Sequence, residues 1–227
     1  QELGATPVLT AAYVIVTFLV LVMAVVYLAL EIRVWLRYRK ANRTPISCNM
    51  TGIDAARLVL EKEGLSHIRV RKAGLLREAV FGNYYNVLTK TIYLRSWLGK
   101  IDQKKSVTSV ALGVQKAALA KLCEEGDQKA LLRNRLSLIA IFGPLLFLPV
   151  LIAGVVLDFA LLDRMGPFSL AGLVLSGLLA VCGLVVTLLN IPVEKQANRL
   201  ALEMMERVRG YLESGIPEGQ YRYDILT

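Results

Sequence analysis

Histidine is almost missing from this chain, because His67 is the single one among 227 residues. That count excludes every metal or catalytic site built from two histidines of one chain. His67 opens a stretch of alternating residues, where an ordinary surface or strand-edge histidine without a partner as ligand or base is expected. With no histidine available as base, serine–histidine and cysteine–histidine nucleophiles are excluded as well.

Cysteine is also scarce. Cys48, Cys123 and Cys182 are scattered along the chain and form no C-x-x-C pair. Neither a disulfide framework nor a cysteine zinc site is therefore expected. A glycine-rich loop that would bind phosphate is missing too. These absences together predict a chain without a bound metal or cofactor.

Charge is absent from three long apolar blocks, at residues 8–30, 136–157 and 167–191. A helix of about 23 residues rises roughly 34 Å, which is enough to cross the hydrocarbon core of a bilayer. Prolines in the second block are tolerated in membrane helices as kinks. The sequence therefore predicts three membrane-spanning helices, with membrane lipids as partners.

Basic residues gather between the first and second blocks. Residues 31–135 hold 21 Lys and Arg against 9 Asp and Glu, which gives this segment a net charge of +12. By the positive-inside rule, the segment belongs on the cytoplasmic, matrix or stromal side, with the N-terminus opposite and the C-terminal tail on the positive side. The membrane expected is a bacterial cytoplasmic membrane or an organellar inner or thylakoid membrane.

The segment between the first two blocks reads as a small α+β domain. Amphipathic periodicity predicts helices over 51–65 and 106–125, and alternation or β-forming residues predict strands over 67–71 and 89–94. A further helix is expected over 194–214. The fold class expected is a mainly α membrane protein with this domain on its positive face. The boundaries expected are 1–36 for the first spanning helix, 37–135 for the soluble domain, 136–193 for a transmembrane hairpin and 194–227 for a C-terminal helix and tail.

The positive charge of this domain raises the question of nucleic acid. A loose basic cluster comprises Arg69, Arg71, Lys72, Arg77, Lys100, Lys104 and Lys105. RNA-binding and helix-turn-helix signatures are missing, and a cationic loop beside an anionic membrane is already expected from the topology. We therefore expect no nucleic-acid partner. Contacts with anionic lipid are expected at the basic residues that flank the apolar blocks, namely Arg37, Arg39, Lys40, Arg43, Arg133 and Arg135.

Four stretches in order carry a resemblance to a known family. Residues 50–60 are similar to L-T-G-x-x-x-A-R-x-x-L, and residues 85–94 to Y-D-P-x-x-K-x-V-x-L. Residues 132–136 look like the entry to a second span, and residues 192–201 resemble P-V-E-F-D-A-S-x-R-A. In this order, the stretches resemble the membrane-bound neutral zinc metallopeptidases of bacteria, the YugP-like family. The likeness covers most of residues 48–205.

The resemblance implies zinc chemistry that this sequence does not carry. The family would need H-E-x-x-H on the helix near residue 117, where two histidines bind zinc and the glutamate activates water. The five motif positions fall on Ala117 to Lys121, or on Gln115 to Leu119 if the register shifts by two. Neither register supplies a histidine or a glutamate. The chain therefore resembles a degenerate member that lacks the motif.

The former site expected from the first register comprises Ala117, Ala118, Lys121 and Glu194. Glu194 stands at the glutamate of P-V-E, and Gln196 replaces the aspartate that follows in the family. Glu194 either forms an ion pair with Lys121 or flanks the start of the last helix, where its charge suits the helix dipole.

The functional expectation is a catalytically inactive relative that serves as a structural or accessory subunit of a larger membrane protein complex. Two alternatives stay open: a regulator or adaptor that binds membrane proteases or their substrates, and a divergent membrane hydrolase that uses other residues. Helix packing against a partner is expected at small residues of the third block, Gly172, Gly177 and Gly183. A self-contained three-helix bundle is the alternative for these residues.

Overall fold

The computed structural model describes residues 50–208 except 98, 164 and 165, together with residues 7, 8, 10–18 and several positions between 22 and 43. The chain divides into two compact units. We call one the helical unit, formed by Gln1–Trp35 and Ser137–Leu188, and the other the mixed unit, formed by Leu36–Leu136 and Leu189–Thr227. Each unit is described by itself below.

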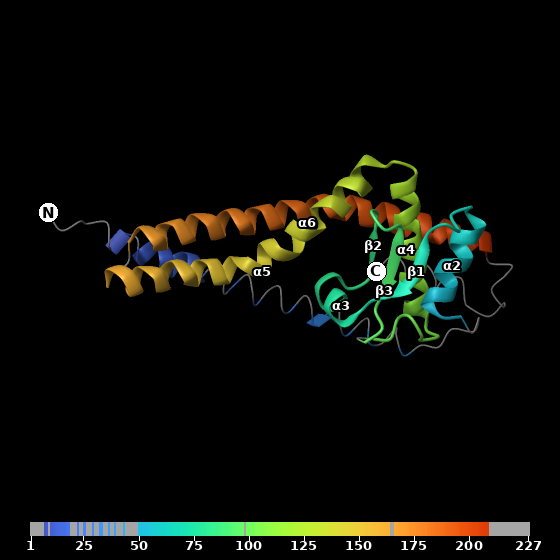
Figure 1. The fold of residues 1–227 in the computed structure, drawn as a ribbon, viewed down its shortest axis with the longest axis horizontal. Helices are drawn as coiled ribbons and strands as arrows, with labels where there is room; N and C mark the ends of the chain where they lie inside the picture. Colours follow the sequence, from blue (N-terminus) through green and yellow to red (C-terminus); the bar gives the residue numbers. More distant parts are fainter. Residues whose placement is uncertain are drawn as a thin grey trace. The chain divides into compact units, whose positions relative to one another are not determined.

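A three-stranded sheet lies in the mixed unit (Figure 1). Its strands are β1 (Arg69–Lys72), β2 (Tyr84–Asn86) and β3 (Thr91–Leu94), in the order β1-β3-β2. β1 runs parallel to β3, with Val70 opposite Ile92, and β2 runs antiparallel to β3. β1 and β3 confirm the two predicted strands. β2 was not predicted, and its three residues are too few to show an alternating pattern.

A short helix, α3 (Leu75–Phe81), separates β1 from β2 and was not predicted. Glu78 is its one buried residue, whereas Leu75 and Leu76 are exposed. This distribution is the reverse of the usual amphipathic helix, so hydrophobic periodicity could not reveal it.

Two helices form the centre of the mixed unit. α2 (Gly52–Lys62) begins at Thr51, whose side chain accepts a hydrogen bond from the Asp54 amide, while the Asp54 carboxylate accepts one from the Thr51 amide. This reciprocal capping box explains why the helix begins there. α4 (Val107–Glu124) begins at Ser106 and is buried along most of its length. Both helices confirm predicted ones.

α2 and α4 approach closely because glycine faces glycine. A Cβ added at Gly113 would lie 2.2 Å from the carbonyl oxygen of Gly52, and one added at Gly52 would lie 2.5 Å from the carbonyl oxygen of Ser109. Side chains from both helices and from β3 join one hydrophobic core, which includes the fully buried Ala117 and Ala118.

Two long helices complete the fold, α5 (Gln128–Leu162) and α6 (Pro167–Val208). The expected break before residue 194 is wrong, because α6 continues through Pro192. Beyond the proline, its residues at three- and four-residue spacing are buried in the core of the mixed unit: Val193, Ala197, Ala201 and Met204. This packing outweighs the helix-breaking tendency of proline.

One described helix, α6, is long and apolar enough to cross a membrane, where the sequence predicted three. The apolar stretch described in α5, Leu146–Leu162, is shorter than the one in α6, and most of the first apolar block lies outside the described residues. The fold is thus mainly helical with one small sheet. Within the helical unit, α5 and α6 run side by side (Figure 1), and Gly154 lies against Gly172.

Candidate functional site

The two alanines predicted to replace motif residues lie in the hydrophobic core. Ala117 and Ala118 on α4 have no exposed surface and carry no polar side-chain atom. They can therefore pack, but they cannot hold a ligand or move a proton. In the first register, these positions of the former site are therefore part of the hydrophobic core.

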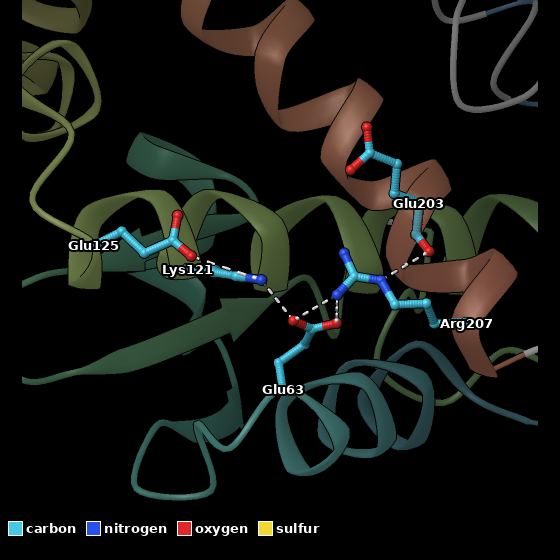
Figure 2. A network of polar contacts seen from close by, with 5 residues as sticks. All are labelled: Glu63, Lys121, Glu125, Glu203 and Arg207. Carbon is cyan, nitrogen blue, oxygen red and sulfur yellow. Dashed lines mark hydrogen bonds and ion pairs between the residues drawn. The ribbon is translucent and has the colours of Figure 1, made fainter.

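Lys121 pairs with Glu63 and not with Glu194, the partner considered from the sequence. Its ammonium lies 2.5 Å from a carboxylate oxygen of Glu63, the residue that caps the end of α2, and 3.6 Å from Glu125 (Figure 2). The other carboxylate oxygen of Glu63 lies 2.8 Å from the guanidinium of Arg207 on α6. Glu63 thus links three helices of the mixed unit, and the hypothesis of a Glu194–Lys121 ion pair is wrong.

Glu194 instead lies among polar groups from three helices. Its carboxylate accepts a hydrogen bond of 3.0 Å from the side-chain amide of Gln115 on α4 and pairs with the guanidinium of Arg133 on α5. The same Gln115 nitrogen donates to the side-chain oxygen of Asn198, one turn along α6, over 2.7 Å. This Glu194 cluster (Gln115, Lys116, Arg133, Glu194 and Asn198) is the main polar group inside the α4–α5–α6 junction of the mixed unit.

Lys116 is the unusual member of the cluster, because only 7% of its surface is exposed. Burial lowers the pKa of its ammonium below the ordinary value, and the nearby Glu194 carboxylate acts against that shift. Burial also opposes the ionisation of Glu194, but Lys116 and Arg133 outweigh it, so the pKa of Glu194 lies below its ordinary value. The cluster therefore places two basic side chains, Lys116 and Arg133, near one carboxylate.

These contacts favour the second of the two motif registers. In that register Gln115 and Leu119 stand where the histidines would be, and Lys116 stands where the glutamate would be. Gln115 touches Glu194 directly, and Leu119 lies four residues further along α4, on the same face. The sequence allowed both registers, and the former site was placed on the first; the second stays a hypothesis that these contacts support. The contact of Gly113 with Gly52 sets how closely α4 packs against α2, and no local sequence pattern indicates this contact.

Zinc does not fit the Glu194 cluster. A catalytic zinc site needs about three protein ligands from histidine, cysteine or carboxylate side chains. Glu194 is the one such ligand here, and the lysine and guanidinium groups beside it would repel a dication. Within the described part of the chain, no group of three or more His, Cys, Asp or Glu side chains is placed to hold a metal ion.

A second polar cluster forms around Glu124 at the end of α4. Its carboxylate accepts hydrogen bonds from Lys90 over 2.8 Å and from the Tyr85 hydroxyl over 3.1 Å, and it lies 3.2 Å from the Nε2 atom of His67. The His67 side chain is 47% exposed, which confirms the expected surface histidine, although it has a neighbour in Glu124 that the sequence did not indicate. These contacts join the segment before β1, β2 and the turn before β3 to the end of α4.

Cys123, one residue before Glu124, is buried and does not provide a nucleophile. Burial raises the pKa of its thiol to about 11. A thiol with such a pKa stays protonated near neutral pH, whereas nucleophilic attack requires the thiolate.

The residues predicted to contact lipid differ in their surroundings. Arg133 is engaged by Glu194, whereas Arg135, Arg39 and Arg43 are exposed. Arg37 and Lys40 lie outside the described residues. Arg133 was named for a surface role, and its long side chain reaches into the cluster because α5 passes beside α6 there.

The three glycines predicted for helix packing differ from one another. Gly172 lies against Gly154 of α5, where an added Cβ would come within 3.1 Å of backbone atoms. Gly183 lies beside Gly143 of α5 in the same way. No described residue lies within 4 Å of the position that a Cβ at Gly177 would take. Two of the three glycines thus serve contacts within the helical unit, and Gly177 has no such contact among the described residues.

The described residues thus form a mainly helical fold with one small sheet, in which a carboxylate on the long helix α6 lies against the central helix α4. Residues 15–218 match the family described as "Putative neutral zinc metallopeptidase". The match covers most of the chain, and the chain belongs to this family. No curated protein and no solved structure matches it.

Proposed function

We propose that this chain is a non-catalytic member of its family, in which the Glu194 cluster occupies the place of a metal site. The observation that carries the proposal is Lys116, a buried basic side chain near the carboxylate that a metal would need. A positive side chain at that place neutralises Glu194 in the way a metal ion would, but it offers no Lewis acid and no bound water.

We also propose that the helical unit spans a membrane. Only 22% of the most apolar window of α6 is buried, and side chains such as Leu178 and Val181 are 59% exposed. A core helix of a water-soluble protein would bury such residues, and so much exposed apolar surface is stable in lipid. With the first apolar block and α5, this gives three spans and a mixed unit on the positively charged side.

A folded body without ligands for catalysis acts through its surfaces, so we propose a structural or accessory role in a larger membrane protein complex. The open position at Gly177 supports this role, since a partner helix can approach closely there. Its apolar neighbours Val174 and Leu178 are exposed beside it. The partner is a membrane protein with a helix to pack on this face.

Native electrophoresis of gently solubilised membranes tests this role. The chain should migrate far above its own mass, and Gly177→Leu should reduce that mass because it fills the open face. Gly172→Leu is the contrasting variant: it clashes with Gly154 and should lower the stability of the chain itself. Migration of the native chain as a monomer, in detergents that preserve neighbouring complexes, would overturn the accessory role.

A further inference from the structure

The mixed unit carries an apolar surface on α3 that none of its described residues covers. Of the seven residues of α3, all described, Glu78 alone is buried. Leu76 is 82% exposed, Leu75 is 55% exposed and Val80 is 37% exposed. Leu76 and Val80 lie one turn apart, on the side of the helix opposite Glu78. A helix that buries its carboxylate and exposes its leucines is arranged for contact with an apolar phase outside the unit.

Glu78 also fixes the position of an exposed tryptophan. Its carboxylate accepts hydrogen bonds from the backbone amides of Ser96 and Trp97, each over 2.9 Å. Hydrogen bonds to a buried carboxylate are strong, so the segment after β3 is held against α3. Trp97 itself is 71% exposed. Two segments separated along the chain therefore present their apolar side chains at the same end of the sheet.

The exposed charges within residues 66–105, which include α3 and Trp97, are all positive. Residues 66–105 contain nine Lys and Arg residues and two acidic residues, Glu78 and Asp102, and both acidic residues are buried. Lys72 lies just before α3, Arg77 lies on it with its guanidinium 5.1 Å from the centre of the Tyr93 ring, and Lys100 follows Trp97. The α3 surface is defined here as Leu75, Leu76, Val80 and Trp97 with these three cations.

We propose that the α3 surface lies on an anionic bilayer, with its leucines and Trp97 below the lipid headgroups and its cations at the phosphates. Tryptophan favours this boundary, and basic residues beside it are drawn to anionic lipid. An acidic protein partner would also attract the cations, but the mixed unit is covalently joined to the apolar α5 and α6, which bring a bilayer within reach. The inference rests on the proposed membrane insertion of the helical unit.

Tryptophan fluorescence in the full-length chain tests the proposal. The chain has two tryptophans, so Trp35→Phe leaves Trp97 as the single reporter. The variant is reconstituted in vesicles of phosphatidylcholine and phosphatidylglycerol, with and without bromine on the upper acyl chains. We expect bromine to quench Trp97 and iodide in the water to leave it bright. Adding Leu76→Ser should weaken the quenching by bromine.

Leu88 provides the matched control, because it is apolar and 95% exposed but lies in the turn between β2 and β3. Tyr84 pairs with Tyr93 and Asn86 with Thr91, so this turn is at the opposite end of the hairpin from Trp97. In a chain with Trp35→Phe and Trp97→Phe, a reporter introduced by Leu88→Trp should be quenched by iodide and not by brominated lipid.

Flotation of the same vesicles separates the possible failures. If the chain floats with the vesicles while iodide quenches Trp97 and bromine does not, the α3 surface proposal is overturned and membrane insertion stands. If Trp97 is shielded from both quenchers, a protein surface covers it and the lipid proposal is again overturned. A chain that does not float with the vesicles contradicts both this inference and the proposed insertion.

Discussion

The side-chain amide of Gln115 donates a hydrogen bond to the carboxylate of Glu194 over 3.0 Å, although 79 residues separate them. This contact joins the central helix of the mixed unit to the stretch that resembles P-V-E in the family. It brings the next residue, the buried Lys116, close enough to compensate the charge of Glu194. At this place the chain thus has an amide, a carboxylate and two basic side chains.

The Glu194 cluster predicts an asymmetry between two substitutions. Glu194→Gln removes the one anion and leaves Lys116 and Arg133 facing each other, which should cost about 2 kcal/mol and lower the Tm by roughly 4–8 °C. Lys116→Met removes a buried charge while Arg133 still pairs with Glu194, so the Tm should stay within about 3 °C of the native value or rise. Thermal unfolding of both variants in detergent checks this. Equal losses would show that Lys116 and Glu194 act as an isolated pair.

Gly113 should tolerate no side chain. Gly113→Ala places a Cβ against the carbonyl oxygen of Gly52, where both partners are helix backbone, so α2 and α4 must move apart at a cost of about 3 kcal/mol. Gly74→Ala is the control, because nothing lies within 4 Å of its Cβ position, and it should leave the Tm nearly unchanged. Similar Tm values for the two variants would mean that the helices do not meet at Gly113.

Glu124 should make the chain more sensitive to acid. Hydrogen bonds from Lys90, and further ones from His67 and Tyr85, lower the pKa of Glu124 below its ordinary value although burial opposes them. The Glu124 carboxylate therefore binds a proton less tightly in the folded state than in the unfolded state. The stabilisation is complete above the ordinary carboxyl pKa and is lost as the pH falls through the lower folded value.

Glu124→Gln should accordingly flatten the acid side of a plot of Tm against pH, from roughly pH 5 downward. Glu125→Gln is the matched control one residue away, where the side chain is 56% exposed. The control should keep the native slope. A native slope in the Glu124 variant would show that its hydrogen bonds contribute nothing to the difference between the folded and unfolded states.

Charge asymmetry predicts that the N-terminus lies on one side of the membrane and the mixed unit on the other. Single cysteines at Gly4, Lys100 and Glu218, in a chain without its native cysteines, report this through a reagent that does not cross membranes. Labelling of Lys100→Cys and Glu218→Cys should occur from the same side, and labelling of Gly4→Cys from the opposite side. Labelling of the Gly4 and Lys100 sites from one side contradicts the topology.

Local signals account for the elements that the sequence predicted. The Thr51–Asp54 capping box and the apolar face of 106–125 determine α2 and α4, and β-forming residues determine β1 and β3. α3 was not predicted because its one buried residue, Glu78, is charged. The backbone amides of Ser96 and Trp97, which bind the Glu78 carboxylate, become its neighbours only in the folded chain. α6 continues past Pro192 because the residues after the proline are buried in the core, and a local sequence pattern does not reveal that burial.

The site was predictable only in part for a similar reason. Resemblance drew attention to Glu194, and the count of histidines excluded the motif. The register of α4 depends on Gly113 meeting Gly52, and the hydrogen-bond partners of Glu194 lie 61 and 79 residues away along the chain. The choice between Lys116 and Lys121 therefore needed the three-dimensional arrangement.

The zinc content of the purified full-length chain tests the central claim, that a charge cluster has replaced the metal site. After dialysis against a mild chelator, elemental analysis should find no stoichiometric zinc in the native chain. The variant Gln115→His, Lys116→Glu and Leu119→His, which supplies ligands beside Glu194, should gain up to about one zinc per chain. Histidine, glutamate and histidine placed instead at Ala117, Ala118 and Lys121 should not bind zinc. A native chain that retains about one zinc per molecule would contradict the account.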